Sequence, residues 1–215
     1  MLAKIVSRRR ILLVVIGLVA VVLGSGSVHG QPPKPEGLEI PETLPTLSGP
    51  VVVTTIGQSP GSVMVRMLFR RIGVACVQND LLTHEQLAQA GKDPKTAYKT
   101  LIMTMGTSLK GMGGAGVDVD GEVARCNALV AQARKSGIFI IGAQIEGSSR
   151  RTDEYDEKSN KAVAPQSDLL IVRSEVDKDG YFTNTAKQKG IPIVRTKEAA
   201  DFEYVFRVLF SAPTK

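Results

Sequence analysis

Six short apolar runs, each followed by an amphipathic stretch, constrain the fold of this chain more than any other feature. They lie at residues 51–56, 74–77, 101–105, 138–145, 169–172 and 191–194. Apolar runs that alternate with helical segments are typical of parallel strands joined by crossover helices, and right-handed crossovers cover both faces of such a sheet. The pattern predicts one doubly wound, Rossmann-like α/β domain of about six parallel strands. Of the two common strand orders, we expect the Rossmann-like order rather than the flavodoxin-like one.

Capping signals indicate where several helices begin. Ser59 is expected to cap the first helix, and residues 83–86 have the pattern of a capping box. Asp118 or Asp120 is expected to cap the long helix that follows, and Thr152 is expected to cap a later, charged helix.

The first 30 residues have the composition of an export signal. A basic start at residues 4–10 precedes an apolar run at 11–23, and small or compact residues follow at 28–30. The apolar run is shorter than the roughly 20 residues of a membrane-spanning helix, so we expect a cleaved signal peptide, with an uncleaved N-terminal anchor as the alternative. Residues 7–13 also resemble a twin-arginine signal, although an ordinary secretion signal is the preferred interpretation.

The next segment separates this signal from the folded part. Residues 31–50 contain six of the eleven prolines, which predicts an extended linker. The folded domain is then expected over residues 51–215.

Most of the net positive charge of the chain lies at its beginning. There are 27 basic and 21 acidic residues, but four basic residues and no acidic ones lie within residues 1–30. The nearly balanced remainder gives no basic stripe for phosphates, so we expect no nucleic acid partner. We expect membrane contact only through the N-terminal segment, and a location outside the cytoplasm, in the periplasm or at the cell surface.

Two cysteines, Cys76 and Cys126, lie among apolar residues and have the pattern of small core side chains. An oxidising compartment would allow a disulfide between them, and the sequence leaves this open. Beyond residue 30 the chain has these cysteines and one histidine, His84, without the spacing of a metal site. We therefore expect no bound metal.

A segment with five glycines, residues 106–118, lies between an apolar run and a long amphipathic helix. Glycines let backbone N–H groups approach a ligand closely, and the start of a helix favours negative charge. The segment is not a P-loop, because Lys110 precedes its last four glycines. We expect an open binding loop, with a flexible surface loop as the alternative. Its expected ligand contacts are Thr107, Ser108, Lys110, Gly113 and Gly114.

The loop after the first run should lie at the same edge, because the carboxyl ends of parallel strands meet there. Its expected ligand contacts are Ser59, Gly61 and Ser62. Asp80 follows Gly61 at about the spacing of a ribose-binding acid, but the glycine pattern is Gly-x-x-x-Gly instead of Gly-x-Gly-x-x-Gly. A capped helix start is therefore preferred to NAD or FAD binding, and the sequence identifies no cofactor.

Charged residues follow the fourth run. Glu146, Arg150 and Arg151 are able to orient a carboxylate through paired hydrogen bonds, or to form a solvated ion pair at a helix start. The two interpretations are equally supported by the sequence, and we include Glu146 and Arg150 among the candidate ligand-binding residues.

No catalytic arrangement is visible in the sequence. There is no Gly-x-Ser-x-Gly elbow and no candidate pair of nucleophile and base. We therefore expect an exported protein that binds a small, anionic molecule at the carboxyl edge of the sheet. The alternatives are an extracytoplasmic enzyme with a nucleotide-type cofactor, and a membrane-proximal module that binds a protein partner.

One short segment is similar to a known enzyme family. Residues 104–109, Thr-Met-Gly-Thr-Ser-Leu, resemble the Gly-Thr-Ser segment of sirtuins, whose domain is a Rossmann-like NAD fold. The histidine expected of that family has no counterpart here. The resemblance therefore concerns the shape of a strand end and does not imply deacylation.

A second resemblance covers nearly the whole chain beyond the N-terminal signal. The motifs that carry it are Gly-Gln-Ser-Pro-Gly at residues 57–61, Lys-Gly-Met-Gly at 110–113, Ile-Ile-Gly at 140–142 and Lys-Asp-Gly-Tyr-Phe at 178–182. With these motifs the chain resembles a family of exported bacterial proteins, the domain-of-unknown-function family catalogued as 6305. The resemblance implies an extracytoplasmic α/β domain and supplies no activity or catalytic residues.

Overall fold

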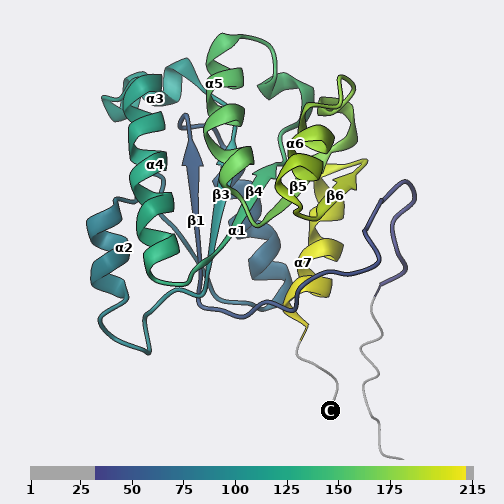
Figure 1. Ribbon diagram of the computed structural model, residues 1–215, viewed down its shortest axis with the longest axis horizontal. Helices are drawn as coiled ribbons and strands as arrows, with labels where there is room; N and C mark the ends of the chain where they lie inside the picture. The colour runs from purple at the N-terminus through teal and green to yellow at the C-terminus, as the bar shows by residue number, and fades with distance from the viewer. Residues whose placement is uncertain (1–31, 212–215) are drawn as a thin grey trace, which may run out of the picture. The chain divides into compact units, whose positions relative to one another are not determined.

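Six parallel strands form one sheet in the computed structural model, which describes residues 32–211 (Figure 1). The strands are β1 (Val51–Ile56), β2 (Cys76–Gln78), β3 (Thr100–Met105), β4 (Phe139–Gln144), β5 (Leu169–Arg173) and β6 (Ile193–Thr196). Strands β1 and β3 are buried along their whole length, as expected for apolar runs that are covered on both faces. The predicted α/β fold of six parallel strands is confirmed.

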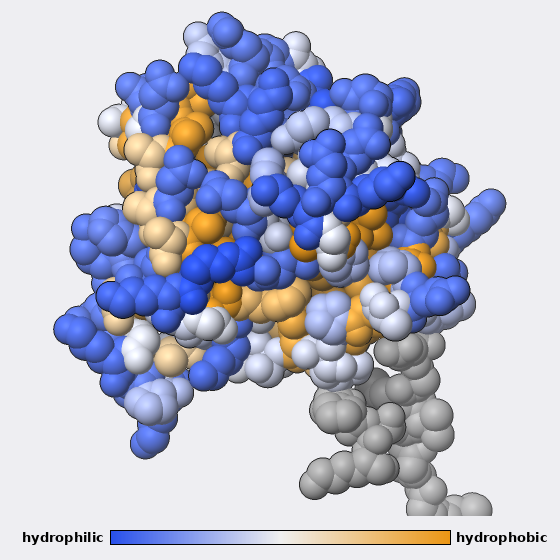
Figure 2. All heavy atoms as spheres, viewed as in Figure 1, coloured by the Kyte–Doolittle hydropathy of each residue, from blue (hydrophilic) through white to orange (hydrophobic). Residues whose placement is uncertain are grey.

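Helices cover both faces of this sheet (Figure 1). The α-helices are α1 (Gly61–Ile72), α2 (His84–Ala90), α3 (Leu109–Ala115), α4 (Val119–Lys135), α5 (Glu154–Val163), α6 (Tyr181–Lys189) and α7 (Phe202–Phe210). Short 3-10 turns are η1 (Gly147–Arg150), η2 (Ala164–Gln166), η3 (Ser174–Val176) and η4 (Ala199–Asp201). Helices α2, α4, α5 and α6 lie on one face, whereas α1 and α7 lie on the other. Figure 2 shows, from the same side as Figure 1, that hydrophilic residues cover most of the outer surface and hydrophobic ones lie between them.

Each face of the sheet has its own apolar core. One core joins the sheet to α4 and α6, for example through Leu129 and Phe182. The other joins it to α1 and α7, where the rings of Phe69 and Phe206 lie 4.6 Å apart. The apolar face of α7 packs into this second core, where Phe202, Val205, Phe206 and Leu209 are all fully buried.

The strand order is β2-β1-β3-β4-β5-β6, which is the flavodoxin-like order with one added strand and not the expected Rossmann-like order. After β1 the chain adds β2 on one side, then crosses back to place β3 on the other side of β1. The order therefore reverses between β1 and β3. Ligands of open α/β sheets bind outside the carboxyl ends of the strands at such a reversal, so the loops that follow β1 and β3 flank this point.

Several helix caps follow the sequence signals and two do not. The capping box that joins Thr83 to Gln86 is confirmed, and the side chain of Asp118 caps α4. Ser59 is not a cap: α1 begins one residue later, after Pro60, and receives no side-chain cap. The helix expected to begin at Thr152 is capped by Asp153, whose carboxylate accepts two backbone N–H bonds.

The proline-rich segment is bound more closely to the domain than a free linker would be. Leu38 is buried in the same core as the apolar residues of α1 and α7, and Glu39 forms an antiparallel bridge with Arg195 of β6. Near its end, the nitrogen of Leu47 donates to the carbonyl of Leu209. Apolar residues among the prolines thus fix this segment against the sheet.

The described part of the chain contains no helix long and apolar enough to cross a membrane. The expected signal peptide, its anchor alternative and the twin-arginine resemblance fall within residues 1–31, outside the residues that the structure describes.

Candidate functional site

The loops after β1 and β3 lie against each other at the carboxyl edge of the sheet, as predicted. Gln58 and Thr107 form an antiparallel bridge, and the nitrogen of Ser108 donates to the carbonyl of Gly57 at 2.7 Å. Gly57 has a φ of 107°, and a Cβ there would lie 2.5 Å from the Cγ2 of Thr107. Glycine at this position is therefore what allows the two loops to touch.

The five-glycine segment is not the open loop expected from its sequence. Most of it forms helix α3, which Ser108 caps by accepting a hydrogen bond from the nitrogen of Gly111. A Cβ on Gly111 would collide with the carbonyl oxygen of Gln58, whereas Gly113 and Gly114 face open space. Gly111 is thus required for packing. Gly113 and Gly114 have no neighbouring atoms where a Cβ would lie, and they share helix α3 with the exposed Lys110.

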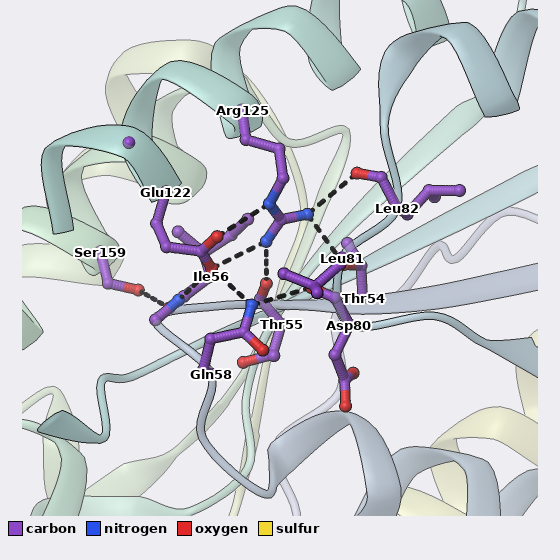
Figure 3. Close-up of polar contacts among 12 residues, drawn as sticks. Thr54, Thr55, Ile56, Gln58, Asp80, Leu81, Leu82, Glu122, Arg125 and Ser159 are labelled. Atoms are coloured by element: carbon purple, nitrogen blue, oxygen red, sulfur yellow. Dashed lines mark hydrogen bonds and ion pairs between the residues drawn. The ribbon is translucent and has the colours of Figure 1, made fainter. Parts of the chain in front are cut away.

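The backbone nitrogen of Gly57 is occupied by a carboxylate of the chain itself (Figure 3). It donates to the Oε2 of Glu122 at 2.9 Å, and the side chain of Gln58 donates to the same oxygen at 3.0 Å. Glu122 lies in the first turn of α4 and is buried. An internal carboxylate therefore stands where the sequence predicted room for a ligand anion.

Arg125 neutralises Glu122 from the next turn of α4 (Figure 3). Its guanidinium donates to both carboxylate oxygens, at 2.9 and 2.8 Å. The remaining N–H groups donate to Thr54, Thr55 and Leu82, so every donor of this arginine is satisfied. The pair fastens α4 to the end of β1 and to the loop after β2.

A second internal carboxylate occupies the start of α1. The nitrogen of Gly61 donates to the Oε1 of Glu146 at 2.9 Å, and Arg150 pairs with the other oxygen of this carboxylate at 2.9 Å. Arg150 also donates to the carbonyl of Thr107 at 2.8 Å. The predicted residues Gly61, Thr107, Glu146 and Arg150 thus come together, but they bind one another.

A third internal carboxylate, Asp156 of α5, holds the end of β3. It is buried and accepts bonds from the nitrogen and the hydroxyl of Thr107, at 2.8 and 2.7 Å. Ser159, one turn further along α5, accepts a bond from the nitrogen of Gly106 and donates to the carbonyl of Ile56. Helix α5 therefore joins the ends of β1 and β3.

The two predicted serines after β1 also have partners within the protein. The hydroxyl of buried Ser59 lies 3.3 Å from that of Thr55. The hydroxyl of Ser62 donates to Asp80 at 2.5 Å, and Gln78 donates to the other oxygen of the same carboxylate at 2.8 Å. The acid considered for ribose binding is thus bonded to the first turn of α1.

A cavity of about 370 Å³ opens further along the same edge, beyond the carboxyl ends of β4 and β5. It is lined by Ser148, Arg151, Glu157, Glu175, Val176, Lys178 and Asp179. This cavity is open to solvent. Its volume is within the roughly 300–1,000 Å³ of small-ligand sites, but so is that of a depression of about 420 Å³ between α4 and α5, so its charged lining and not its volume distinguishes it. Of the lining residues, the sequence analysis considered Arg151 alone as a ligand contact.

Arg151 lines this cavity and is held by two carboxylates and two aromatic rings. Its guanidinium pairs with both oxygens of Asp179, each at 2.7 Å, and with Glu157 at 2.7 Å, while it lies over the rings of Tyr181 and Phe182. Burial alone would lower the pKa of Arg151, but these hydrogen bonds raise it above its ordinary value. Hydrogen bonding to Arg151 in turn lowers the pKa of the Asp179 carboxyl.

The other charges of the cavity differ in how firmly they are held. Glu175 accepts a bond from the nitrogen of Ser148 at 3.1 Å and pairs with Arg173 at 3.2 Å. Lys178 is exposed and forms no ion pair with the residues that the structure describes. The cavity thus offers one free cation among carboxylates that already have partners.

Sequence reasoning missed Glu122, Arg125, Asp156 and Lys178. The first two are visible as an acid and a base three residues apart at the start of a helix, a spacing that places them on one face. The same spacing is common on solvated helix surfaces, so it does not reveal burial.

The family of the chain follows from a sequence comparison over residues 48–210. This segment matches the model of "Domain of unknown function (DUF6305)". The chain belongs to the DUF6305 family. The predicted membership is thereby confirmed, and no curated protein matches the chain.

Solved structures with similarity to this DUF6305 protein are distant. A GDSL-like lipase from Bacteroides thetaiotaomicron is 11% identical, with a TM-score of 0.35 over 74% of this chain and 83% of that one. The esterase EstA from a Pseudoalteromonas species is 9% identical, with a TM-score of 0.34 over 69% and 78% of the two chains. A GDP-L-fucose synthetase from Naegleria fowleri bound to NADP is 13% identical, with a TM-score of 0.34 over 74% and 52%. At these scores the similarities carry no argument about the function of the DUF6305 domain.

Proposed function

We propose that this protein binds a small polar molecule with an anionic group at the carboxyl edge of its sheet, in the cavity beside η1 and η3. The observation that carries the proposal is the free ammonium group of Lys178 at a cavity of about 370 Å³ whose other charges are already paired. A ligand carboxylate or phosphate would supply the missing partner of this lysine. The hydroxyl of Ser148 would donate a further hydrogen bond.

The acidic residues of the cavity narrow the class of ligand. Glu157, Glu175 and Asp179 each have an arginine partner, and their remaining lone pairs are able to accept hydrogen bonds. A ligand with hydroxyl or ammonium donors beside its anionic group would match both sets of groups. Hydroxy acids, amino acids and sugar phosphates have this combination.

The cavity beside η1 and η3 is a better candidate for the ligand site than the backbone amides at the ends of β1 and β3, because those amides already have hydrogen-bond partners. The backbone nitrogens of Gly57, Gly61 and Thr107 would hold an anion, but carboxylates of the chain already accept their hydrogen bonds. A ligand anion at Gly57 or Gly61 would have to displace a carboxylate and leave Arg125 or Arg150 without its partner, which is unfavourable. At Thr107 it would have to displace the buried carboxylate of Asp156.

A thermal-shift screen against hydroxy acids, amino acids, sugar phosphates and nucleotides tests the proposal. A ligand at one hundred times its Kd stabilises the folded state by about 2.7 kcal/mol, which raises the melting temperature measurably. The shift should disappear in the Lys178→Ala variant and persist in Lys110→Ala, a matched loss of an exposed lysine at the same edge. If the rise in melting temperature is lost in Lys110→Ala instead, the ligand binds at α3. If no class of compound raises the melting temperature, the proposal is contradicted.

We further infer that the protein is exported, because the basic and apolar pattern of residues 4–23 is that of a secretion signal. Mass spectrometry of the chain purified from its natural host would test this by giving its N-terminal residue. A mature chain that begins near residue 31 in an extracytoplasmic fraction is expected. A full-length chain in the cytoplasm would contradict export.

A further inference from the structure

Strand β2 is an edge of the sheet, and on its outer side its backbone groups have no partner among residues 32–211. The nitrogen of Val51 donates to the carbonyl of Ala75, and the nitrogen of Asn79 donates to the carbonyl of Val53. In a parallel ladder alternate residues of a strand face the neighbouring strand, so Cys76 and Gln78 direct their backbone N–H and C=O groups away from β1. Such an edge is a template for a further strand.

Apolar side chains lie on both faces of this edge. Val77 is 49% exposed on the face that carries α2, and Met67 of α1 is 52% exposed. On the α1 side a groove of about 260 Å³ runs beside the strand, lined by Arg66, Met67, Arg70, Val74 and Cys76. An added strand would direct every second side chain toward this groove.

The groove is positively charged. Arg66 and Arg70 are exposed and form no ion pair with any residue that the structure describes, while the next arginine, Arg71, lies 3.6 Å from Glu203. Burial raises the pKa of the Cys76 thiol to about 12, and Arg66 is close enough to lower it in part. The acid nearest to β2 in sequence, Asp80, already accepts bonds from Ser62 and Gln78.

We propose that the edge of β2 is a docking site for an extended, acidic segment of a partner protein, which adds to the sheet as a further strand. Carboxylates at the positions that face the groove would pair with Arg66 and Arg70, and small apolar side chains at the positions between them would cover Val77 on the other face. Strand addition of this kind gains affinity from backbone hydrogen bonds and specificity from alternate side chains.

Charge argues against the other occupants. A second copy joined edge to edge would bring two sets of Arg66 and Arg70 together, which like-charge repulsion disfavours. The parts of this chain that lie outside the structure, residues 1–31 and 212–215, contain basic residues and no Asp or Glu. Neither complements the groove.

Selection from a random octapeptide library displayed against the purified chain tests this proposal. Enriched peptides are expected to carry acidic residues at alternate positions. We expect their affinity to fall at least tenfold in the double variant Arg66→Glu/Arg70→Glu. The matched control Lys187→Glu/Lys189→Glu reverses the same number of charges on exposed positions of α6 and should leave the affinity unchanged.

Backbone methylation separates strand addition from attraction by charge alone. Two forms of an enriched peptide, N-methylated at odd or at even positions, keep the same side chains. Only alternate N–H groups of an added strand face β2, so one form should bind and the other should not. Equal binding of both forms, no enrichment of acidic peptides, or a dimer in sedimentation that Arg66→Glu/Arg70→Glu dissolves would each overturn the proposal.

Discussion

The carboxylate of Glu122 accepts a hydrogen bond at 2.9 Å from the nitrogen of Gly57, a residue 65 positions earlier in the chain. The contact replaces a ligand anion by an internal one at the point where the strand order reverses. Glu146 and Asp156 do the same at Gly61 and Thr107. The backbone amides at the ends of β1 and β3 are therefore satisfied by carboxylates of the chain itself. The cavity beside η1 and η3 remains as the proposed ligand site.

Removal of the Glu122 carboxylate should strongly destabilise the protein. In Glu122→Ala the guanidinium of Arg125, which is 13% exposed, keeps its charge without its partner, and the cost of such a loss is about 3–5 kcal/mol. Urea unfolding followed by circular dichroism measures it. Asp120→Ala is the control, since this side chain lies two residues earlier on α4 but is 80% exposed, and its midpoint should stay near that of the natural chain. Equal effects of the two substitutions would refute the bracing role of Glu122.

Glycines within α3 should respond to substitution in opposite directions. Gly111→Ala places a Cβ against the carbonyl oxygen of Gln58, and such overpacking costs about 1–3 kcal/mol. Gly113→Ala adds a Cβ in open space on the same helix, where alanine is favoured over glycine by up to about 1 kcal/mol. The melting temperature should therefore fall in Gly111→Ala and stay the same or rise in Gly113→Ala. A destabilised Gly113→Ala would mean that this surface also needs glycine.

The fold was largely predictable because its signals are local. Apolar runs gave the strands, and Gly73 and Gly190 end α1 and α6 with a left-handed residue, as helix-terminating glycines do. The strand order was not predictable, because a chain that adds β2 on either side of β1 has the same alternation of strands and helices. Helix α3 was missed since three of its seven residues are glycine, and its packing against Gln58 outweighs that low propensity.

The meeting of the loops after β1 and β3 was predictable, but the hydrogen bonds that join them were not. Parallel strands place residues 57–62 and 106–118 at one edge, whatever the strand order. Which group satisfies each backbone nitrogen depends on long-range contacts, such as that of Glu146 with Gly61. A charged side chain near a helix start has the same sequence pattern whether it faces solvent or a buried amide, so the sequence alone suggested a vacant anion site.

Both cysteines should be reduced and slow to react. Cys76 lies on the α1 face of the sheet and Cys126 on the α4 face, so no disulfide joins them. Burial raises the pKa of each thiol to about 12, which removes the reactive thiolate at neutral pH. A thiol-reactive chromophore at pH 8 should therefore detect two thiols in urea without reductant, and react slowly with the native chain.

The same shifts have a consequence at alkaline pH. The pKa of each thiol is higher in the folded chain than the unfolded value of 9.0. The stability that the two buried, protonated thiols contribute is therefore complete below pH 9 and is lost as the pH rises toward about 12. Cys126→Ala should reduce that alkaline loss relative to the natural chain. An oxidised pair in the denatured protein, or rapid reaction of the native protein, would contradict the packing of the two cysteines.

The ion pair of Arg151 with Asp179 should make the free energy of unfolding depend on pH in the acidic range. Arg151 lowers the pKa of Asp179 below its ordinary value of 3.8, so the pair contributes fully above that value and is lost as the pH falls through the lower, folded pKa. Asp179→Asn should reduce the free energy of unfolding at pH 7 by at most about 1 kcal/mol, since this carboxylate is 59% exposed and solvent screens the pair. The difference from the natural chain should shrink as unfolding is measured at pH 5, 4 and 3. Glu154→Gln removes an equal charge at the exposed start of α5 and should show no such trend, and a difference that grows toward low pH would show that Asp179 is held protonated instead.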